Sequence, residues 1–239
     1  MYRFFCENLG SQPLSGTIEL DREQARHALR VLRLEAGAEI ELFDGRGHTA
    51  RGLIVEADAR SNRARIEPGA VTYHRPTRPA LVVATAVPKG PLADQMVVQL
   101  SQIGVDRLVP LRTQRSIVDP NPAKLVRFGR AAIESAKQSR RAHAMAINET
   151  VSLEVVLEER HTLGLIAQPD AAPVGGLTFE LRRADSVLVL IGPEGGFTDD
   201  EVALAQHAGC RQWRLGPHVL RIETAAIAAA AVVRYLALT

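Results

Sequence analysis

Residues 187–201 read Val187-Leu188-Val189-Leu190-Ile191-Gly192-Pro193-Glu194-Gly195-Gly196-Phe197-Thr198-Asp199-Asp200-Glu201. The stretch begins with an uninterrupted apolar run, Val187–Ile191, which is typical of a strand buried on both faces of a sheet. Glycines and a proline follow at once. Thr198 and Glu201 then form the capping-box pattern that begins a helix. The stretch therefore predicts a strand, a tight loop and a helix in succession, the building unit of an α/β fold.

The same alternation extends on both sides of this stretch. The predicted strands are Leu81–Val87, Arg107–Leu111, Leu163–Ala167, Val187–Ile191 and Gln212–Leu215. The predicted helices run from about Pro91 to Ile103, around Ala123–Arg141, over Thr198–Ala208 and onwards from about Glu223. Strands that alternate with helices in this way predict an α/β domain with a mainly parallel sheet.

The first segment of the chain has a different pattern of predicted elements, with short strands close together. Glu39–Phe43 alternates polar and apolar residues, and Asp44–Gly47 supplies the residues of a hairpin turn. Asp21 is the expected N-cap of a helix that runs to about Leu34. Further short strands are expected at His48–Ala57 and Ala64–Glu67, and this close spacing is typical of a small barrel.

Prolines separate the two segments. Pro68-Gly69 interrupts the strand pattern, and the run Arg75-Pro76-Thr77-Arg78-Pro79 follows. Proline at this density is typical of a linker. We therefore expect two domains, residues 1–70 and residues 75–239.

Composition narrows the class of protein. The chain has 239 residues, of which 46% are hydrophobic and 23% charged, which excludes disordered and fibrous classes. No apolar run is long enough to cross a bilayer, and residues 1–7 show no signal-peptide pattern. The two cysteines, Cys6 and Cys210, exclude a disulfide framework, and no histidine spacing indicates a metal site. We expect a cytoplasmic protein without a metal.

Arginines on the first helix suggest a nucleic-acid partner. Arg22, Arg26, Arg30 and Arg33 recur at helical spacing on one face. Because like charges on one face repel, an anionic phosphate backbone would stabilise them. The alternative is a solvated face that Glu23 and Glu35 neutralise. The chain has 26 Arg against 3 Lys, an excess that either phosphate binding or a GC-rich genome explains.

Two glycine-containing loops follow predicted strands, where open α/β sheets bind ligands. Ile191–Gly196 lacks the Gly-Lys-Ser/Thr of a phosphate loop, and Glu194 would repel phosphate. A cationic or hydroxyl-bearing ligand fits it better, and a simple tight turn is the alternative. In the second loop, Leu215–Ala225, the apolar residues Leu215, Val219 and Leu220 offer a slot for a flat heterocycle. Val87–Gly90 is a third glycine-containing loop after a predicted strand, and it is a weaker indication of a ligand site.

These two loops resemble the SPOUT class of RNA methyltransferases, and most closely the bacterial 16S ribosomal RNA uridine-N3 methyltransferases. The resemblance rests on Gly192–Phe197 and Leu215–Ala225 together. Further matches cover both segments: Arg30–Leu34, Leu42–Gly45, Lys89-Gly90, Ile103–Val105 and Lys137–Ser139.

The resemblance implies an N-terminal PUA-like β-barrel that binds RNA and a C-terminal SPOUT-type α/β trefoil-knot domain. It also implies a homodimer that acts in ribosomal RNA processing and methylates N3 of a uridine in 16S ribosomal RNA, with the small ribosomal subunit as partner. S-adenosylmethionine is the implied cofactor. By position, its expected ligands are Ala167, Ile191, Gly192, Glu194, Gly195, Gly196, Leu215, Gly216 and Leu220.

Two residues of the second loop are candidates for catalysis. Loss of the N3 proton spreads negative charge over the base carbonyls, and a fixed Arg221 would stabilise that charge. Glu223 would orient Arg221 or accept a proton, and the alternative is that it supports the start of the last helix. Lys89 and Arg141 join the arginine face as expected RNA contacts. The alternatives are a non-catalytic RNA-binding protein and a small-molecule methyltransferase, which would not need the basic helix.

Overall fold

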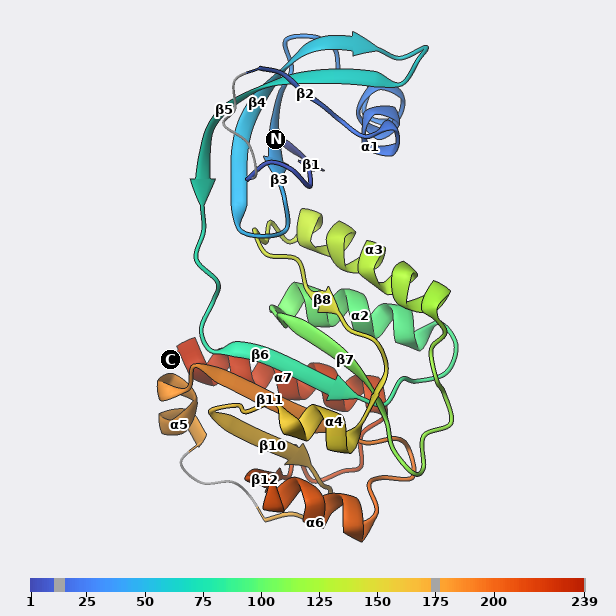
Figure 1. Cartoon of the computed structure of the whole chain (residues 1–239), viewed down its shortest axis with the longest axis vertical. Helices are drawn as coiled ribbons and strands as arrows, with labels where there is room; N and C mark the ends of the chain where they lie inside the picture. Colours follow the sequence, from blue (N-terminus) through green and yellow to red (C-terminus); the bar gives the residue numbers. More distant parts are fainter. Residues whose placement is uncertain (11–15, 173–176, 239) are drawn as a thin grey trace. The chain divides into compact units, whose positions relative to one another are not determined.

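The computed structural model describes residues 1–10, 16–172 and 177–238, and it divides into two compact units. The first unit comprises Met1–Pro76 with Ala136–Ala144, and the second comprises Thr77–Ser135 with Met145–Thr239. Figure 1 shows the course of the chain through both. Each unit has its own apolar core.

The first unit is built on a five-stranded sheet in the order β1-β3-β4-β5-β2. Its strands are β1 (Tyr2–Phe5), β2 (Ile18–Glu19), β3 (Glu39–Phe43), β4 (His48–Asp58) and β5 (Arg63–Tyr73). β3 and β4 form the antiparallel hairpin predicted from the turn residues between them. Ile54 and Ile66 face each other across β4 and β5 and are fully buried, because alternate strand residues point into the core.

The helix of the first unit is shorter than predicted. α1 (Arg22–Arg26) begins at Asp21, whose carboxylate caps two backbone N–H groups as expected. A single π-helical turn, η1 (His27–Val31), follows it, and Arg33 has a positive φ of 55°. The N–H of Leu34 closes this end with a hydrogen bond back into the π turn. The helix therefore ends before Leu34.

The predicted break at Pro68-Gly69 is wrong. β5 continues through both residues, and Pro68 pairs with Gly52 of β4. The register shifts between Ala50 and Gly52, where the ladder is irregular. An irregularity of this kind tolerates a proline, which has no N–H to donate to the ladder.

The second unit holds a sheet in the order β12-β10-β11-β6-β7-β8, with β9 paired to β7. Its strands are β6 (Ala80–Thr85), β7 (Arg107–Arg112), β8 (Ala146–Ile147), β9 (Val151–Ser152), β10 (Leu163–Ala167), β11 (Ser186–Ile191) and β12 (Cys210–Trp213). Every pairing is parallel. The predicted parallel α/β architecture is confirmed, and the very short β8 and β9 are additions to it.

Helices cover both faces of this sheet (Figure 1). They are α2 (Leu92–Ile103), α3 (Pro122–Gln138), α4 (Leu153–Glu158), α5 (Leu177–Arg183), α6 (Asp199–His207) and α7 (Ile222–Leu238). Val83 and Val189 belong to the core formed with α2, α5 and α7, whereas Val82 and Leu190 belong to the core formed with α4 and α6. This double cover explains why the central strands β6, β10 and β11 are almost entirely apolar.

Arg234 joins the last helix to the beginning of the sheet. Its side chain is buried and donates to the carbonyl of Pro79 (2.6 Å), to that of Gly104 (3.0 Å) and to Oδ2 of Asp106 (2.6 Å). The same Asp106 oxygen accepts the N–H of Leu81 at 2.8 Å. One guanidinium therefore holds α7 against the chain segments that lead into β6 and β7.

We expect Arg234→Ala to lower the free energy of unfolding by about 3–5 kcal/mol, because the substitution leaves buried acceptors without their cation. Urea denaturation measures the loss. Arg127→Ala is the matched control: Arg127 also pairs with an aspartate, Asp94, but its side chain is 61% exposed. Arg127→Ala should lower the free energy of unfolding by less than about 1 kcal/mol. Equal losses in the two variants would contradict this assignment.

Candidate functional site

Three strands of the second unit end at one edge of the sheet. β10 pairs in parallel with both β11 and β12, so the loops that follow these strands meet at the edge where open α/β sheets bind ligands. A cavity of about 420 Å³ lies there, within the usual range for small-molecule sites. Its walls are residues 167–170 after β10, residues 191–199 after β11, and residues between Trp213 and Ala225 after β12.

The nine residues predicted to bind a cofactor all line this cavity. They are Ala167, Ile191, Gly192, Glu194, Gly195, Gly196, Leu215, Gly216 and Leu220. The structure thus brings together three loops that are far apart in the sequence. The binding role of these residues stays a prediction.

A buried carboxylate fixes the glycine loop. Glu201, at 6% exposure, accepts the N–H of Thr198 at 2.8 Å and the N–H of Gln114 at 2.8 Å. The hydroxyl of Thr198 accepts the N–H of Glu201 in return, so the predicted capping box is confirmed. The bond to Gln114 was not predicted. It ties the loop after β11 to the segment after β7.

Arg115 adds a second connection between these segments. Its Nη1 donates to the carbonyl of Gly195 at 2.6 Å. Its methylene groups lie so close to Gly195 that a Cβ there would meet Arg115 Cδ at 3.3 Å. A side chain at this cavity-lining position would therefore press on Arg115, whose methylene groups would have to shift by a few tenths of an ångström. Sequence reasoning missed Arg115, because nothing local to residue 115 indicates a partner some eighty positions further on.

The cavity combines an apolar wall with carboxylates. Trp213, Leu215 and Ile222 supply apolar surface, and three carboxylates line the remainder: Asp170, Glu194 and Asp199. The lining residues that the structure describes include no Lys or Arg. Such a cavity suits a ligand with a flat apolar part and positive charge.

Gln168 adds a polar group to the cavity wall. Its backbone N–H donates to the carbonyl of Trp213 at 3.0 Å, which holds it at the end of β10. Its Nε2 is buried and has no partner among the described residues. An unsatisfied buried donor costs free energy, so a ligand acceptor within reach would be stabilised by it. Gln168 was not among the residues predicted from the sequence.

The two predicted catalytic residues lie beside the cavity, outside its lining. Arg221 is exposed and directly precedes α7, where its carbonyl accepts the N–H of Ala225 at 2.8 Å. Glu223 is half-buried in the first turn of α7. Their neighbours Leu220 and Ile222 do line the cavity. The geometry is compatible with a role at the cavity entrance, and that role stays a prediction.

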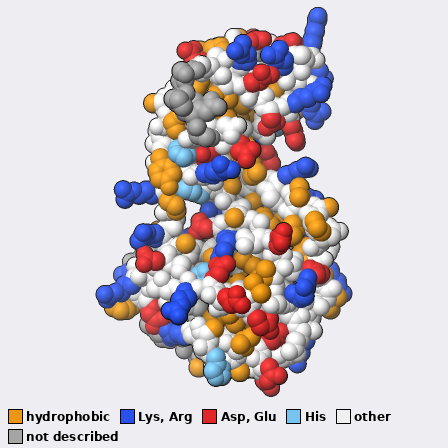
Figure 2. Space-filling model, viewed as in Figure 1, with side chains coloured by type: hydrophobic (Ala, Val, Ile, Leu, Met, Phe, Trp, Pro, Cys, Tyr) orange, Lys and Arg blue, Asp and Glu red, His pale blue; other side chains and the backbone are white. Residues whose placement is uncertain are grey.

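The predicted arginine face is only partly formed. Arg22 and Arg26 are exposed on α1, and Arg30 bonds to the carbonyls of Ala59 and Arg60. Arg33 lies beyond the helix in a left-handed conformation, so it leaves the face expected for four residues. Lys and Arg side chains nevertheless gather around α1 and the tip of the β4–β5 hairpin (Figure 2).

Lys89 and Arg141 fall in different units. Lys89 is exposed in the loop between β6 and α2 of the second unit. Arg141 belongs to the segment Ala136–Ala144 of the first unit and is half-buried. The predicted RNA contacts thus fall on two separate units of the chain.

No helix among the described residues is long and apolar enough to cross a membrane. In the same part of the chain, the His, Cys, Asp and Glu side chains form no group of three that could hold a metal ion. Cys210 packs in the core of the second unit, and burial raises the pKa of its thiol to about 11.

Comparisons with known proteins agree with this architecture. Residues 75–234 match the RNA methyltransferase domain, and residues 20–67 match the RNA methyltransferase PUA domain. Ribosomal RNA small subunit methyltransferase E of Mycobacterium bovis is 29% identical over 240 residues, which cover 95% of this chain and 88% of that protein.

Two solved structures are similar over nearly their full length. A ribosomal RNA small subunit methyltransferase E from Neisseria gonorrhoeae, bound to S-adenosyl methionine, gives a TM-score of 0.87 at 25% identity and covers 99% of this chain and 98% of that one. A putative methyltransferase from Legionella pneumophila, in complex with the cofactor SAM, gives 0.86 at 27% identity and covers 98% and 97%.

Fold and matches together define the class: an RNA methyltransferase with an N-terminal PUA-like domain and a C-terminal SPOUT-like parallel α/β domain. The fold class expected from the resemblance is thereby confirmed. Within that class, the chain belongs to the ribosomal RNA small subunit methyltransferase E family.

We expect Glu201→Ala to loosen the glycine loop, because two backbone N–H groups lose their acceptor. A loss of 1–3 kcal/mol corresponds to roughly 5- to 150-fold faster amide exchange across residues 192–198. Hydrogen–deuterium exchange with mass spectrometry measures it. Asp200→Ala, at an exposed carboxylate in the same helical turn, is the control. Unchanged exchange in Glu201→Ala would show that the loop does not depend on this bond.

Proposed function

We propose that the chain transfers a methyl group from S-adenosylmethionine to N3 of a uridine in small-subunit ribosomal RNA, in the cytoplasm. The observation that carries the proposal is the convergence of three loops on one acidic and apolar cavity in a chain of this family. Relatives with the same fold bind this cofactor. We assign residues 75–239 to catalysis and residues 1–70 to RNA binding.

The residues of the cavity fit the cofactor. Trp213, Leu215 and Ile222 match a purine ring, while Glu194 and Asp199 match positive charge. The buried amide of Gln168 offers a donor to a polar oxygen. When bound, S-adenosylmethionine supplies an activated methyl group on a sulfonium with a neutral leaving group. The protein's own contribution is then to position the reactants and to exclude water.

Arg221 and Glu223 act on the base. Arg221 stabilises the negative charge that spreads over the uridine carbonyl oxygens once N3 has lost its proton. Glu223 orients the arginine or accepts the proton. The base leaves its stack to reach the donor, and the Arg22 and Arg26 side chains hold the surrounding backbone. Lys89 and Arg141 extend these contacts.

We infer that the chain works as a homodimer, as its resemblance implies. In support, α7 carries Val232, Tyr235 and Leu238 with exposed surface at helical spacing. Light scattering of the purified protein measures the mass in solution. A monomer at micromolar concentration would contradict this part of the proposal.

A non-catalytic RNA-binding protein on the same scaffold is the alternative. Isothermal titration with S-adenosylmethionine separates the two, because a binding module without the cofactor gives no heat. Methyl transfer is then tested on naked 16S RNA and on the assembled small subunit, followed by mass mapping of the modified nucleotide. Binding of the cofactor without methylation of either RNA would contradict the proposed reaction.

We expect Arg221→Ala to lower turnover tenfold or more, on the order of one lost charge interaction at the transition state. Cofactor affinity should stay nearly unchanged, because the side chain lies outside the cavity lining. Single-turnover methylation and titration calorimetry measure the two quantities. Arg214→Ala, at another exposed arginine near this loop, is the control. Equal losses of turnover and affinity in Arg221→Ala would assign Arg221 to folding or cofactor binding instead.

We expect Glu194→Gln to reduce the preference for S-adenosylmethionine over S-adenosylhomocysteine, which lacks the sulfonium charge, by about two- to fivefold, as suits an exposed carboxylate. Titration of both ligands into each protein gives the ratio. Asp200→Asn, outside the cavity lining, should leave the ratio unchanged. If the ratio is the same in wild type and Glu194→Gln, the sulfonium does not bind close to Glu194.

A further inference from the structure

Tyr73 stands at the centre of an exposed aromatic and basic surface on the first unit. We propose that this surface, defined by Tyr73, His48, His143, His74 and Arg46 and called here the tyrosine platform, stacks an unpaired base of the RNA substrate. The proposal rests on the RNA substrate of the proposed function. It adds a contact to the arginine face that the sequence indicates.

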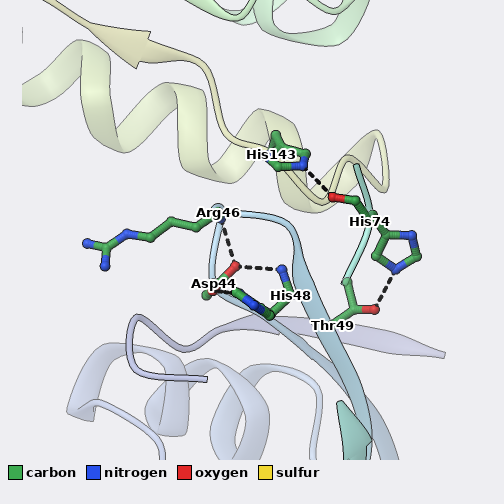
Figure 3. A network of polar contacts seen from close by, with 6 residues as sticks. All are labelled: Asp44, Arg46, His48, Thr49, His74 and His143. Carbon is green, nitrogen blue, oxygen red and sulfur yellow. Dashed lines mark hydrogen bonds and ion pairs between the residues drawn. The ribbon is translucent and has the colours of Figure 1, made fainter. Parts of the chain in front are cut away.

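The loop below the platform is rigid. The carboxylate of Asp44 is buried at 3% exposure and accepts the N–H of Arg46 at 2.7 Å and that of His48 at 3.0 Å. Its second oxygen bonds to Nδ1 of His48 at 2.7 Å. Figure 3 shows these bonds, with the Arg46 side chain extending away from them. The turn therefore fixes the ring of His48 and the backbone of Arg46, from which the Arg46 side chain extends.

Residues 142 and 143, from a separate segment of the first unit, pack against the platform. Nε2 of His143 donates to the carbonyl of His74 at 2.8 Å (Figure 3). The N–H of Gly47 donates to the carbonyl of Ala142 at 3.1 Å. Gly47 has a φ of 108°, and a Cβ there would lie 2.7 Å from both His143 and Tyr73. Glycine at this position therefore lets both rings pack onto the turn.

Tyr73 is held without being covered. Its ring centroid lies 5.1 Å from that of His48 and 6.3 Å from that of His143. The residue is nevertheless 54% exposed. In the view of Figure 2, histidine side chains border an apolar patch where β5 ends. An aromatic ring that is fixed and exposed loses little entropy when a base stacks on it.

The histidines present polar atoms beside the ring. A carbonyl oxygen only accepts, so Nε2 of His143 carries a hydrogen and donates it, which leaves Nδ1 outside this bond. Nδ1–H of His48 donates to the Asp44 carboxylate, and this bond leaves Nε2 of His48 available. Neither remaining nitrogen has a protein partner among the described residues. These atoms match the donors and acceptors at the edge of a base.

Charge favours a nucleic acid over an apolar protein partner. Arg46 is exposed, and its only acidic partner among the described residues is the equally exposed Glu7 at 3.4 Å. Arg75 and Arg140 are further exposed cations close in sequence to Tyr73 and His143. Single-stranded RNA is held by aromatic rings that stack bases and by cations that meet phosphates. The platform offers both.

The test uses the full-length protein and a single-stranded fragment of 16S RNA that carries 5-bromouridine. Irradiation of the complex, followed by mass mapping, should place an adduct on the peptide that contains Tyr73. Fluorescence anisotropy should show roughly 5- to 150-fold weaker binding for Tyr73→Ala and Tyr73→Leu, while Tyr73→Phe stays near wild type. Because the substitution removes no charge, the slope of log affinity against log salt should not change.

Tyr2→Ala is the matched control, since Tyr2 is 49% exposed on β1 of the same unit and, among the described residues, the ring contacts of His48 and His143 are with Tyr73. It should bind like wild type. Wild-type affinity in Tyr73→Ala and Tyr73→Leu, or a changed mass in light scattering with RNA affinity intact, would overturn the proposal. The second result would make the platform a protein interface.

Failure of the proposed function has a different signature. One outcome is that wild type transfers no methyl group to any 16S substrate while Tyr73→Ala still weakens RNA binding. This result would support the stacking role of the platform and contradict the proposed reaction. If wild type methylates its substrate and Tyr73→Ala does so with unchanged kcat and KM, the platform fails and the reaction stands.

Discussion

Parallel pairing of β10 with β11 on one side and β12 on the other is the constraint on which the site depends. Parallel strands end at the same edge of a sheet, so three loops that are far apart in sequence leave it together. Ala167 pairs with Trp213 at that edge, and the next N–H, that of Gln168, extends the ladder into the cavity wall. Reversing any one of these strands would send its loop to the opposite edge.

Much of this fold is predictable from patterns of burial. Strands covered on both faces must be apolar throughout, and β10 and β11 show this directly in the sequence. Departures occur where a tertiary contact overrides a local signal. Pro68 reads as a break, yet an irregular ladder opposite Gly52 accommodates it. The helix ends early because a π turn and a left-handed Arg33 replace the last regular turn.

The candidate site also has features that the sequence predicts and features that it does not. Glycines after apolar runs mark the loops, because only the backbone can approach a ligand so closely there. The groups that fix the loops do not show locally. Gln114 contributes a backbone N–H, which any residue has, and Arg115 is one arginine among 26. The platform around Tyr73 likewise depends on His143, which the chain brings back from a separate segment.

Both surfaces use the same physical device. Glu201 in the second unit and Asp44 in the first are buried carboxylates that each accept two backbone N–H groups. An ionised carboxylate has several acceptor positions, so one side chain can fix two points of a turn. Its burial is offset by those charge-assisted bonds. Phe197 adds an apolar anchor to the glycine loop, and the outer atoms of both turns remain available to ligands.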